Sequence, residues 1–284
     1  MTDFTIPVGG LGAGSQPTEE DDAELAFMSM PSEMATYSMP DISAPISALA
    51  QANASLQQIQ QGLDQYQAGQ SNVVVDLSAL DTENRELMDQ VLGEGEVSIV
   101  FTAEVQVRIQ ESVLAGVWRV QYLNASGEVE KDTVEIGDIP RVVRDKTFAG
   151  AGIAQTIDKQ DCPAGVNNAI PLLTELNDKI KVSSETSEPH TINLTLLPQS
   201  DEDLAFLAER LGKGPVTILS RGYGNCRVSS TMTKNVWWVQ YFNSQDAIIL
   251  NTLEVTPVPI VVCASQEDIE DSAQRLQEIR EVYA

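Results

Sequence analysis

Apolar residues recur at steps of three and four residues in two stretches that precede strand-like segments. The first stretch, residues 46–67, carries this stripe at Ile46, Leu49, Ala52, Leu56, Ile59 and Leu63. The second carries it at Ile170, Leu173, Leu176 and Ile180. Because an α-helix turns about once every 3.6 residues, each stripe predicts an amphipathic helix with one buried face. Apolar runs follow both stretches, at Val73–Val75 and Ile192–Leu196, and predict strands.

Two shorter helices are predicted from the residues at their ends. Ser200 and Asp203 have the spacing of a capping box, and Gly212 supplies a stop. Asp81 and Gly93 occupy the corresponding positions earlier in the chain. Strands are then expected at about residues 96–101, 105–110, 117–123 and 129–136, with equivalents 119 residues later. A last stripe predicts a C-terminal helix through Ile269, Ala273, Leu276, Ile279 and Tyr283.

The chain contains an internal repeat, because residues 76–143 align with residues 195–262 without a gap, at a constant offset of 119. The clearest match is between Val117–Asn124 and Val236–Asn243. Such a repeat is a duplicated supersecondary unit. The fold class is therefore predicted to be α+β: a tandem duplication of a helix-plus-antiparallel-sheet unit, with a disordered acidic N-terminal arm and a C-terminal helix. The expected boundaries are 1–45 (arm), 46–150 (first repeat), 151–263 (second repeat) and 264–284 (helix).

Residues 1–45 have the composition of a mobile, acidic arm. Twelve Asp and Glu precede Arg85, which is the first Lys or Arg of the chain. A segment with so few aliphatic residues cannot bury enough surface to offset the entropy lost on ordering. Met28, Met30 and Met34 are interleaved with turn-forming residues. The arm is either a solvated tail or, since methionine is flexible and polarisable, an adaptable surface for a basic and apolar partner.

The two copies serve as controls for each other, because positions kept in both belong to the shared fold. Side chains alternate between the faces of a strand. The face of the first copy that carries Trp118 and Tyr122 is kept in the second copy, which predicts that it is core. On the opposite face Trp238 replaces Arg119, and the second copy also gains Phe242. This aromatic pair either packs against the other copy or a terminal helix, or forms an exposed anchor for a partner.

The largest divergence between the copies lies at Arg221–Arg227, where the first copy has Thr102–Arg108. The two glycines of this segment permit a tight or bulged backbone and the close approach of another chain. Arg108 and Arg227 correspond and are assigned to the fold. Cys226 is specific to the second copy and has either a binding or thiol role or the role of a small buried thiol in a shaped turn. The predicted partner-binding residues are Tyr223, Asn225, Cys226, Trp238, Phe242, Met28, Met30 and Met34.

The charge of the chain restricts its partners. There are 42 Asp and Glu against 17 Lys and Arg, which gives a formal net charge of -25. Such a chain repels phosphate backbones and anionic membrane surfaces, so we expect no nucleic-acid or membrane partner. The start of the sequence lacks the basic and apolar regions of a secretory signal, and three scattered cysteines suit a reducing compartment. These features favour a cytoplasmic location.

Candidates for catalysis or metal binding are few. The chain has one histidine, and it lacks a Walker lysine, a Gly-x-Ser-x-Gly elbow and a Cys-x-x-Cys pair. We therefore expect neither an enzyme nor a bound cofactor. Cys162, Cys226 and His190 are the candidates for a metal site. Cys162 is expected to be the most reactive thiol, because its segment is predicted to open a helix, and a helix N-terminus lowers a thiol pKa.

Several segments carry a shared resemblance: Ile6–Gly10, Gly14–Pro17, Asp161–Pro163, Arg221–Arg227 and Asn235–Asn243. Together they resemble the HupH/HyaF/HoxQ family of hydrogenase expression and formation proteins. The resemblance runs through most of the chain and implies a cytoplasmic, non-catalytic accessory protein in the maturation of nickel-iron uptake hydrogenases. It also implies a partner, the iron-sulphur small-subunit precursor with its basic twin-arginine signal, and possibly other accessory proteins.

Two other functions stay open at this point. An iron-sulphur or metal carrier would need thiol ligands from both Cys162 and Cys226. A small-ligand-binding module would need a deep polar pocket in the second copy. Composition favours the accessory protein, because the chain lacks catalytic groups while the arm and the aromatic residues suit macromolecular contact.

Overall fold

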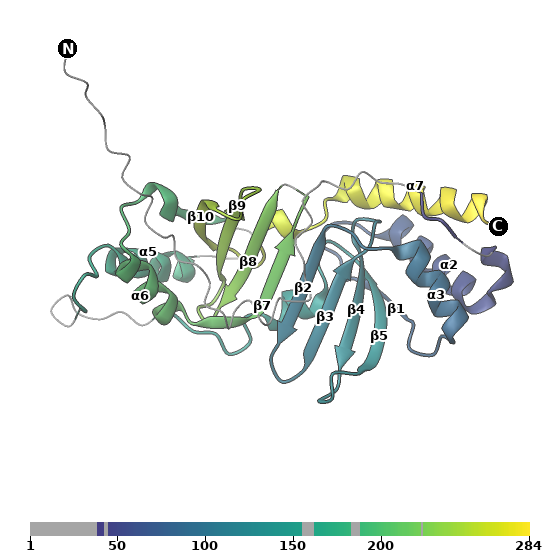
Figure 1. The fold of residues 1–284 in the computed structure, drawn as a ribbon, viewed down its shortest axis with the longest axis horizontal. Helices are drawn as coiled ribbons and strands as arrows, with labels where there is room; N and C mark the ends of the chain where they lie inside the picture. Colours follow the sequence, from purple (N-terminus) through teal and green to yellow (C-terminus); the bar gives the residue numbers. More distant parts are fainter. Residues whose placement is uncertain (1–38, 43–44, 155–161, 183–187, 223) are drawn as a thin grey trace, which may run out of the picture.

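An antiparallel sheet runs through the whole molecule (Figure 1). The computed structural model describes residues 39–42, 45–154, 162–182, 188–222 and 224–284. In these residues the sheet has 10 strands, in the order β1-β5-β4-β3-β2-β7-β8-β9-β10-β6. The strands are β1 (Val73–Asp76), β2 (Val97–Thr102), β3 (Gln106–Glu111), β4 (Val117–Leu123), β5 (Val129–Ile136), β6 (His190–Asn193), β7 (Lys213–Ser220), β8 (Asn225–Thr231), β9 (Val236–Phe242) and β10 (Ile248–Val255). The predicted α+β class is confirmed.

The helices include those predicted from the sequence and one at residues 141–146 that was not predicted. They are α2 (Ala50–Gln65), α3 (Thr82–Leu92), α4 (Arg141–Lys146), α5 (Ala169–Val182), α6 (Asp201–Leu211) and α7 (Gln266–Val282), with short 3-10 turns η1 (Ile46–Ala48), η3 (Leu194–Leu196) and η4 (Ile260–Val262). Ser200 and Asp203 form the capping box of α6, and Asp81 caps α3. Of the helices that the structure describes, none is both long and apolar enough to cross a bilayer.

The two copies meet edge to edge at one antiparallel pair, which we call the seam. There β2 of the first copy pairs with β7 of the second, and Ile99 lies opposite Ile218, its own repeat equivalent. Phe101 lies opposite Val216, the equivalent of Val97. A pairing in which each residue meets its counterpart in this way is that of a two-fold interface. The copies are therefore related by a local two-fold axis through the seam, as two subunits of a dimer would be.

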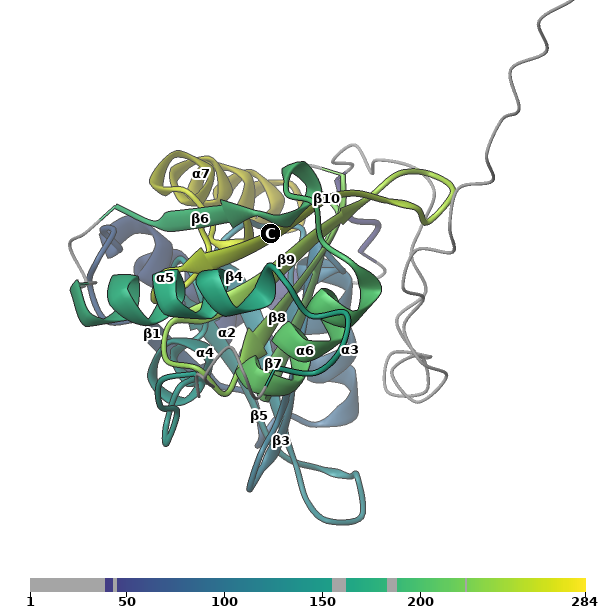
Figure 2. The same ribbon diagram turned by 90° about the vertical axis from the view of Figure 1, so that its left-hand side faces the viewer.

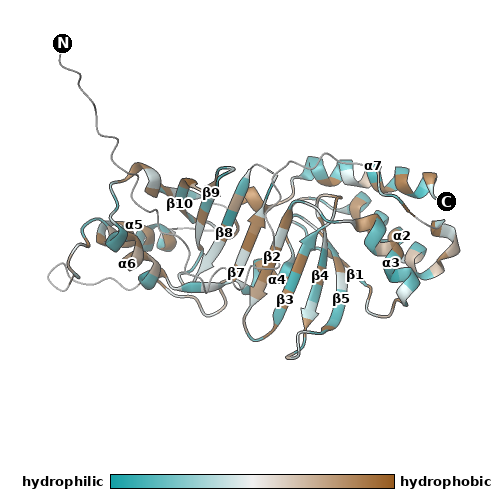
Figure 3. Ribbon diagram, in the orientation of Figure 1, coloured by the Kyte–Doolittle hydropathy of each residue, from teal (hydrophilic) through white to brown (hydrophobic). Residues whose placement is uncertain are grey.

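Helices cover the two ends of one face of the sheet, as the side view in Figure 2 shows for α5 and α6 of the second copy. Helices α2, α3 and α7 bury a separate core on the first copy. On the opposite face a third core crosses the seam and includes α4 and η4. Trp118 and Trp237 are fully buried in it, which confirms the core face predicted from the repeat. Apolar and polar residues are interspersed both along the central strands and along α7 (Figure 3).

Each copy is completed by the segment that follows the other. Helix α7 follows the second copy but packs on α2, where Gln60 Nε2 donates to the Ala273 carbonyl at 3.0 Å. Residues 147–154 follow the first copy and reach α5, where Asn177 Nδ2 donates to the Ala154 carbonyl at 2.8 Å. The two hydrogen bonds occupy matching places about the local axis. This exchange ties the copies together beyond the seam.

Helix α5 begins later than the sequence suggested, and the reason is a tertiary contact. One carboxylate oxygen of Asp203 accepts from the backbone N–H groups of Asn167, Asn168 and Ala169, at 2.8, 2.8 and 3.0 Å. These groups form the start of α5, so Asp203 of α6 fixes where α5 begins. Cys162 lies outside the helix, and the prediction that it opens the helix is wrong. In the first copy Asn84, the equivalent of Asp203, accepts from the Ala52 N–H of α2 at 2.9 Å.

The strand predicted at residues 192–196 is shorter than expected. β6 ends at Asn193, and Leu194–Leu196 form the turn η3. The Asn193 side chain accepts from the backbone N–H groups of Thr195 and Leu196, at 3.0 and 3.3 Å. Such a side-chain cap competes with continued strand pairing. The alternation of apolar residues alone did not show that the strand ends at Asn193.

The seam leads to a prediction about stability. Replacing Ile99 or Ile218 by Ala is expected to lower the free energy of unfolding by about 2–5 kcal/mol each, because both side chains are buried in the core that crosses the seam. Because the two residues are in contact, their effects should not add in the double variant. Urea unfolding measures both. Val129→Ala, at an exposed site, should change stability by less than about 0.5 kcal/mol. Separate unfolding of the two halves would contradict a shared core.

Asp203 gives a prediction about pH. Burial raises the pKa of Asp203, but hydrogen bonds from the N–H groups of Asn167, Asn168, Ala169 and Ser200 outweigh this effect and lower the pKa overall. A lowered folded-state pKa stabilises the fold above the unfolded value of about 3.9, and the benefit is lost as pH falls through the folded value. Asp203→Asn should therefore cost about 1–3 kcal/mol at neutral pH.

Thermal unfolding of Asp203→Asn and the parent chain across pH 3–7 tests this expectation, and the difference between them should shrink below about pH 4. Asp201→Asn, which removes an exposed carboxylate from the same helix turn, is the control and should cost less than about 1 kcal/mol. A difference that stays constant down to the lowest pH would show that the charge of Asp203 does not hold α5.

Candidate functional site: a basic cleft on the first copy

An open cleft of about 950 Å³ lies on the first copy, on the sheet face opposite α2 and α3. Its floor is formed by strands β2 to β5 and includes Phe101, Val107 and Tyr122. Helix α4 and the β2–β3 loop form its walls. Residues 213–215 of the second copy close one end, so the cleft depends on the seam for its shape.

Four cationic side chains line this cleft. They are Lys131 of β5, Arg141 and Lys146 of α4, and Lys213 of β7. Lys131, Arg141 and Lys146 form no ion pair with any residue that the structure describes. The Lys131 Nζ lies 5.6 Å from the centre of the Tyr122 ring, within cation–π range. Burial raises the pKa of Tyr122, so this phenol stays neutral at physiological pH.

Three carboxylates share the cleft, and one of them is committed to the fold. Glu135 is buried and accepts from the backbone N–H of Arg141 at 2.8 Å and from Asn72 Nδ2 at 3.2 Å. It thereby holds the start of α4 against the sheet. Glu104 and Asp145 are exposed in the walls. The solvent-facing lining therefore has four cations and two anions, in a chain of net charge -25.

The second copy has equivalent strands at this place, but it has the short turn η4 where the first copy has α4, and its charges differ. Tyr122 and Glu135 are kept as Tyr241 and Glu254. The equivalents of Lys131, Arg141, Lys146 and Lys213 are Leu250, Ile260, Ser265 and Glu94. The strands equivalent to β5 and β7 form without these cations, because Leu250 replaces Lys131 in the second copy and Glu94 replaces Lys213 in the first. The cations are the feature that distinguishes the first copy.

The predicted partner-binding residues are only partly within the described part of the chain. Tyr223, Met28, Met30 and Met34 lie outside it. Asn225 begins β8 and is half-buried. Cys226 is 1% exposed, and burial raises the pKa of its thiol to about 12. Its equivalent is Val107, and both side chains belong to the core that crosses the seam.

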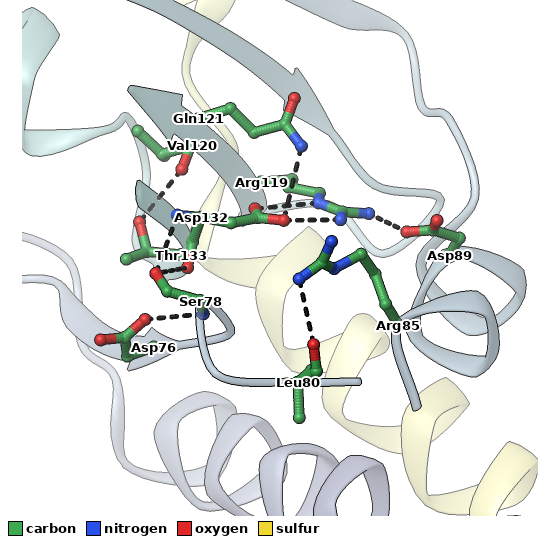
Figure 4. Close-up of polar contacts among 10 residues, drawn as sticks. All are labelled: Asp76, Ser78, Leu80, Arg85, Asp89, Arg119, Val120, Gln121, Asp132 and Thr133. Carbon is green, nitrogen blue, oxygen red and sulfur yellow. Dashed lines mark hydrogen bonds and ion pairs between the residues drawn. The ribbon is translucent and has the colours of Figure 1, made fainter. Parts of the chain in front are cut away.

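Trp238 takes the place of a charged network. In the first copy Arg119 binds Asp132 through Nε at 3.1 Å and Nη2 at 2.7 Å, and it also pairs with Asp89 of α3 (Figure 4). In the second copy the indole N–H of Trp238 donates to Asn251, the equivalent of Asp132. Trp238 is half-buried against the core beneath α5 and α6. It therefore packs against helices of its own copy, and its role in partner binding stays a prediction.

Phe242 ends β9 and is also half-buried. The guanidinium carbon of Arg227 lies 5.9 Å from the centre of its ring. Gly222, in the turn before β8, passes so close to Glu96 of the first copy that a Cβ there would lie 2.1 Å from the carboxylate. The residue that approaches Gly222 therefore belongs to the first copy of the same chain, and the approach of another chain stays a prediction. Binding by Asn225 and Phe242 stays a prediction as well.

The cysteines do not converge on a metal site. Cys162 packs with the core beneath α5 and α6, and its thiol donates to the Val166 carbonyl at 3.3 Å. Cys226 lies on the opposite face of the sheet. His190 Nε2 lies 2.7 Å from Glu175 Oε1. Among the described residues there is no group of three or more His, Cys, Asp or Glu that could hold a metal ion. A shared site of Cys162 and Cys226 therefore has no support in the structure.

The fold is that of a duplicated α+β protein, and comparison with known proteins identifies its family. The model of the HupH hydrogenase expression protein, C-terminal conserved region, matches residues 49–151 and 166–283. The chain belongs to this family. The two matched regions correspond to the two copies.

The relatives match over almost the whole chain. The hydrogenase expression/formation protein HupQ of Azotobacter chroococcum mcd 1 is 47% identical, over 96% of this chain and 95% of the relative. HoxQ of Cupriavidus necator is 46% identical over 98% of each. The hydrogenase-1 operon protein HyaF of Escherichia coli is 31% identical, over 95% of this chain and 94% of its own. A solved structure, hydrogenase expression protein HupH from Thiobacillus denitrificans, is 32% identical, with a TM-score of 0.38, and covers 40% of this chain and 95% of its own.

The sequence reasoning missed the cations of the cleft because it searched for residues gained by the second copy. The signal was present in the gapless alignment, where Lys131 faces Leu250 and Arg141 faces Ile260. At these two positions the first copy is cationic and the second is apolar, so they distinguish the first copy in the same way as an added residue would distinguish the second. Only the cleft shows that these positions lie together.

The thiols lead to a prediction about reactivity. Cys162 is half-buried, whereas burial raises the pKa values of Cys226 and Cys263 to about 12. In the native protein a maleimide reagent should therefore label Cys162 at least about a hundredfold faster than the other two thiols, because the thiolate is the reactive form. Mass spectrometry of the labelled peptides measures this ratio. Cys162→Ser should abolish the fast reaction, and rapid labelling of Cys226 would contradict its burial.

Proposed function

We propose that this protein is a non-catalytic accessory protein in the maturation of a nickel-iron uptake hydrogenase, and that it binds the iron-sulphur small-subunit precursor in the cytoplasm. The observation that carries the proposal is family membership over nearly the whole chain, with relatives named as hydrogenase expression/formation proteins. Equal coverage of both copies indicates that the complete duplicated unit performs the task.

The architecture supports binding as the mode of action. The cleft is open and lined by side chains from both copies, while the buried thiols and carboxylates take part in the fold. An accessory protein of this kind needs surface that recognises a client, and the exposed charges of the chain provide it. The cleft lies mainly on the first copy, so it does not support the alternative of a small-ligand module in the second copy.

The acidity of the chain suits the proposed client. A twin-arginine signal is basic, and a net charge of -25 attracts a basic segment at long range and speeds the encounter. Residues 1–38 carry the acidic cluster Glu19–Glu24 and the methionines Met28, Met30 and Met34. We assign the first contact with the signal to this part of the chain.

Capture of purified precursor by the immobilised full-length chain tests the proposal. We expect the precursor to bind, and the variant lacking residues 1–38 to bind at least tenfold more weakly with a smaller dependence on salt. The deletion should stop before residue 39, because Ile42 and Ile46 are buried and the Pro40 carbonyl accepts from the Tyr283 hydroxyl at 2.9 Å.

The control is a precursor whose two signal arginines are replaced by glutamine, which removes the charge and keeps the length. It should bind about as weakly to the full chain as the native precursor binds to the deletion variant. Capture of the large subunit alone would redirect the proposal to another client. Unchanged binding and salt dependence after deletion would show that the arm is not the contact.

A further inference from the structure

The cleft is lined by four cationic side chains, in a chain that carries 42 Asp and Glu against 17 Lys and Arg. They come from three separate elements, β5, α4 and β7, and line one open space. Like charges that line one space repel one another, and an anion that binds between them relieves this repulsion. Among the described residues Lys131, Arg141 and Lys146 form no ion pair, although Asp76 lies close enough to Lys131 to interact with its charge.

Apolar side chains accompany these cations. Val74, Val105 and Met232 line the cleft and are 42%, 47% and 49% exposed. Tyr122 lines the same cleft, and burial raises the pKa of its hydroxyl. A surface that combines exposed apolar groups with cations fits an occupant that carries both apolar and anionic groups.

The shape of the cleft favours a polypeptide. Its lining reaches from Val74 on the edge strand β1 to Lys213 on β7. These strands are five positions apart in the sheet order, which corresponds to about 24 Å at the usual strand spacing. An extended chain covers that distance with about seven residues. Small ligands are instead largely enclosed by their pockets, whereas this cleft is partly open to solvent.

We propose that the cleft binds an extended, carboxylate-bearing segment of a partner polypeptide, with Lys131, Arg141 and Lys146 pairing with its carboxylates and Val74, Val105 and Met232 contacting its apolar side chains. This goes beyond the proposed function and shares with it only the premise that the partner is a protein. A basic signal sequence does not fit this surface. The segment bound here is therefore a different part of the partner.

Fluorescence anisotropy with the full-length chain tests the proposal. The probe is a fluorescein-labelled eight-residue peptide in which glutamate and leucine alternate, and the matched probe has glutamine in place of every glutamate. The glutamate peptide should bind at least tenfold more tightly. Equal binding of the two probes would overturn the proposal, because charge would then not be recognised.

Two variants test whether the cleft is the binding site. Lys131→Leu with Arg141→Ile introduces the residues of the second copy, which that copy folds with, and Lys131→Glu with Arg141→Glu reverses the charge. Both should weaken binding of the glutamate peptide at least tenfold. The control, Lys179→Glu with Lys181→Glu on α5, changes the net charge by the same amount as the reversal and should change binding by less than twofold. If the control weakened binding as much as the cleft variants, binding would be due to overall charge.

Competition separates a polypeptide occupant from a small anion. Unlabelled glutamate peptide should displace the probe, whereas citrate and inorganic phosphate at the same concentration should not. Displacement by either small anion at the concentrations that suffice for the peptide would overturn the polypeptide assignment. The two proposals have separate readouts. If the full chain fails to capture the precursor but its cleft binds the glutamate peptide, only the proposed function is contradicted. If the full chain captures the precursor, and the Lys131→Leu, Arg141→Ile variant also does, but the cleft does not bind the peptide, only the cleft proposal is contradicted.

Discussion

The pairing of β2 with β7 is the contact on which the rest of the structure depends. Without it each copy would have an exposed central edge and half of a core, because the apolar face around Ile99 and Ile218 is continuous across the seam. An unpaired edge strand also invites association with other chains. The pairing of β2 with β7 about the local two-fold axis gives both edge strands a hydrogen-bonded neighbour. The order of the strands, the shared core with both buried tryptophans and the closed end of the cleft all follow from this one pair.

A symmetric frame makes departures from symmetry informative. Where both copies keep a residue, as with Tyr122 and Tyr241, the fold explains it. Where they differ, the two residues either pack the equivalent place in different ways or give one copy a property that the other lacks. Arg119 with Asp132 and Trp238 with Asn251 are two such solutions, because each pair joins the same strands beneath a helix. The cations of the cleft have no counterpart of that kind in the second copy, so packing does not explain them.

The sequence predicts those features that depend on neighbours along the chain. The caps at Asp81 and Ser200, the stripe of α7 and the alternation around Trp118 all depend on residues a few positions apart, and they were predicted correctly. The start of α5 was not, because it is set by Asp203, which lies more than thirty residues further on. The seam and the cleft were also beyond reach, because no local pattern shows which strand edges will meet or which distant lysines will share a surface.

The distribution of charge assigns different tasks to different parts of the chain. At physiological ionic strength the field of an exposed charge falls off within about 8 Å, so the net charge of -25 governs the approach of a partner and the cleft is sensed only after contact. On the two proposals made above, the acidic residues attract a basic segment of the partner and the cleft binds an acidic one. A partner that satisfies both proposals carries basic and acidic segments. Two weak contacts of opposite sign, joined in one molecule, discriminate against any protein that offers only one of them.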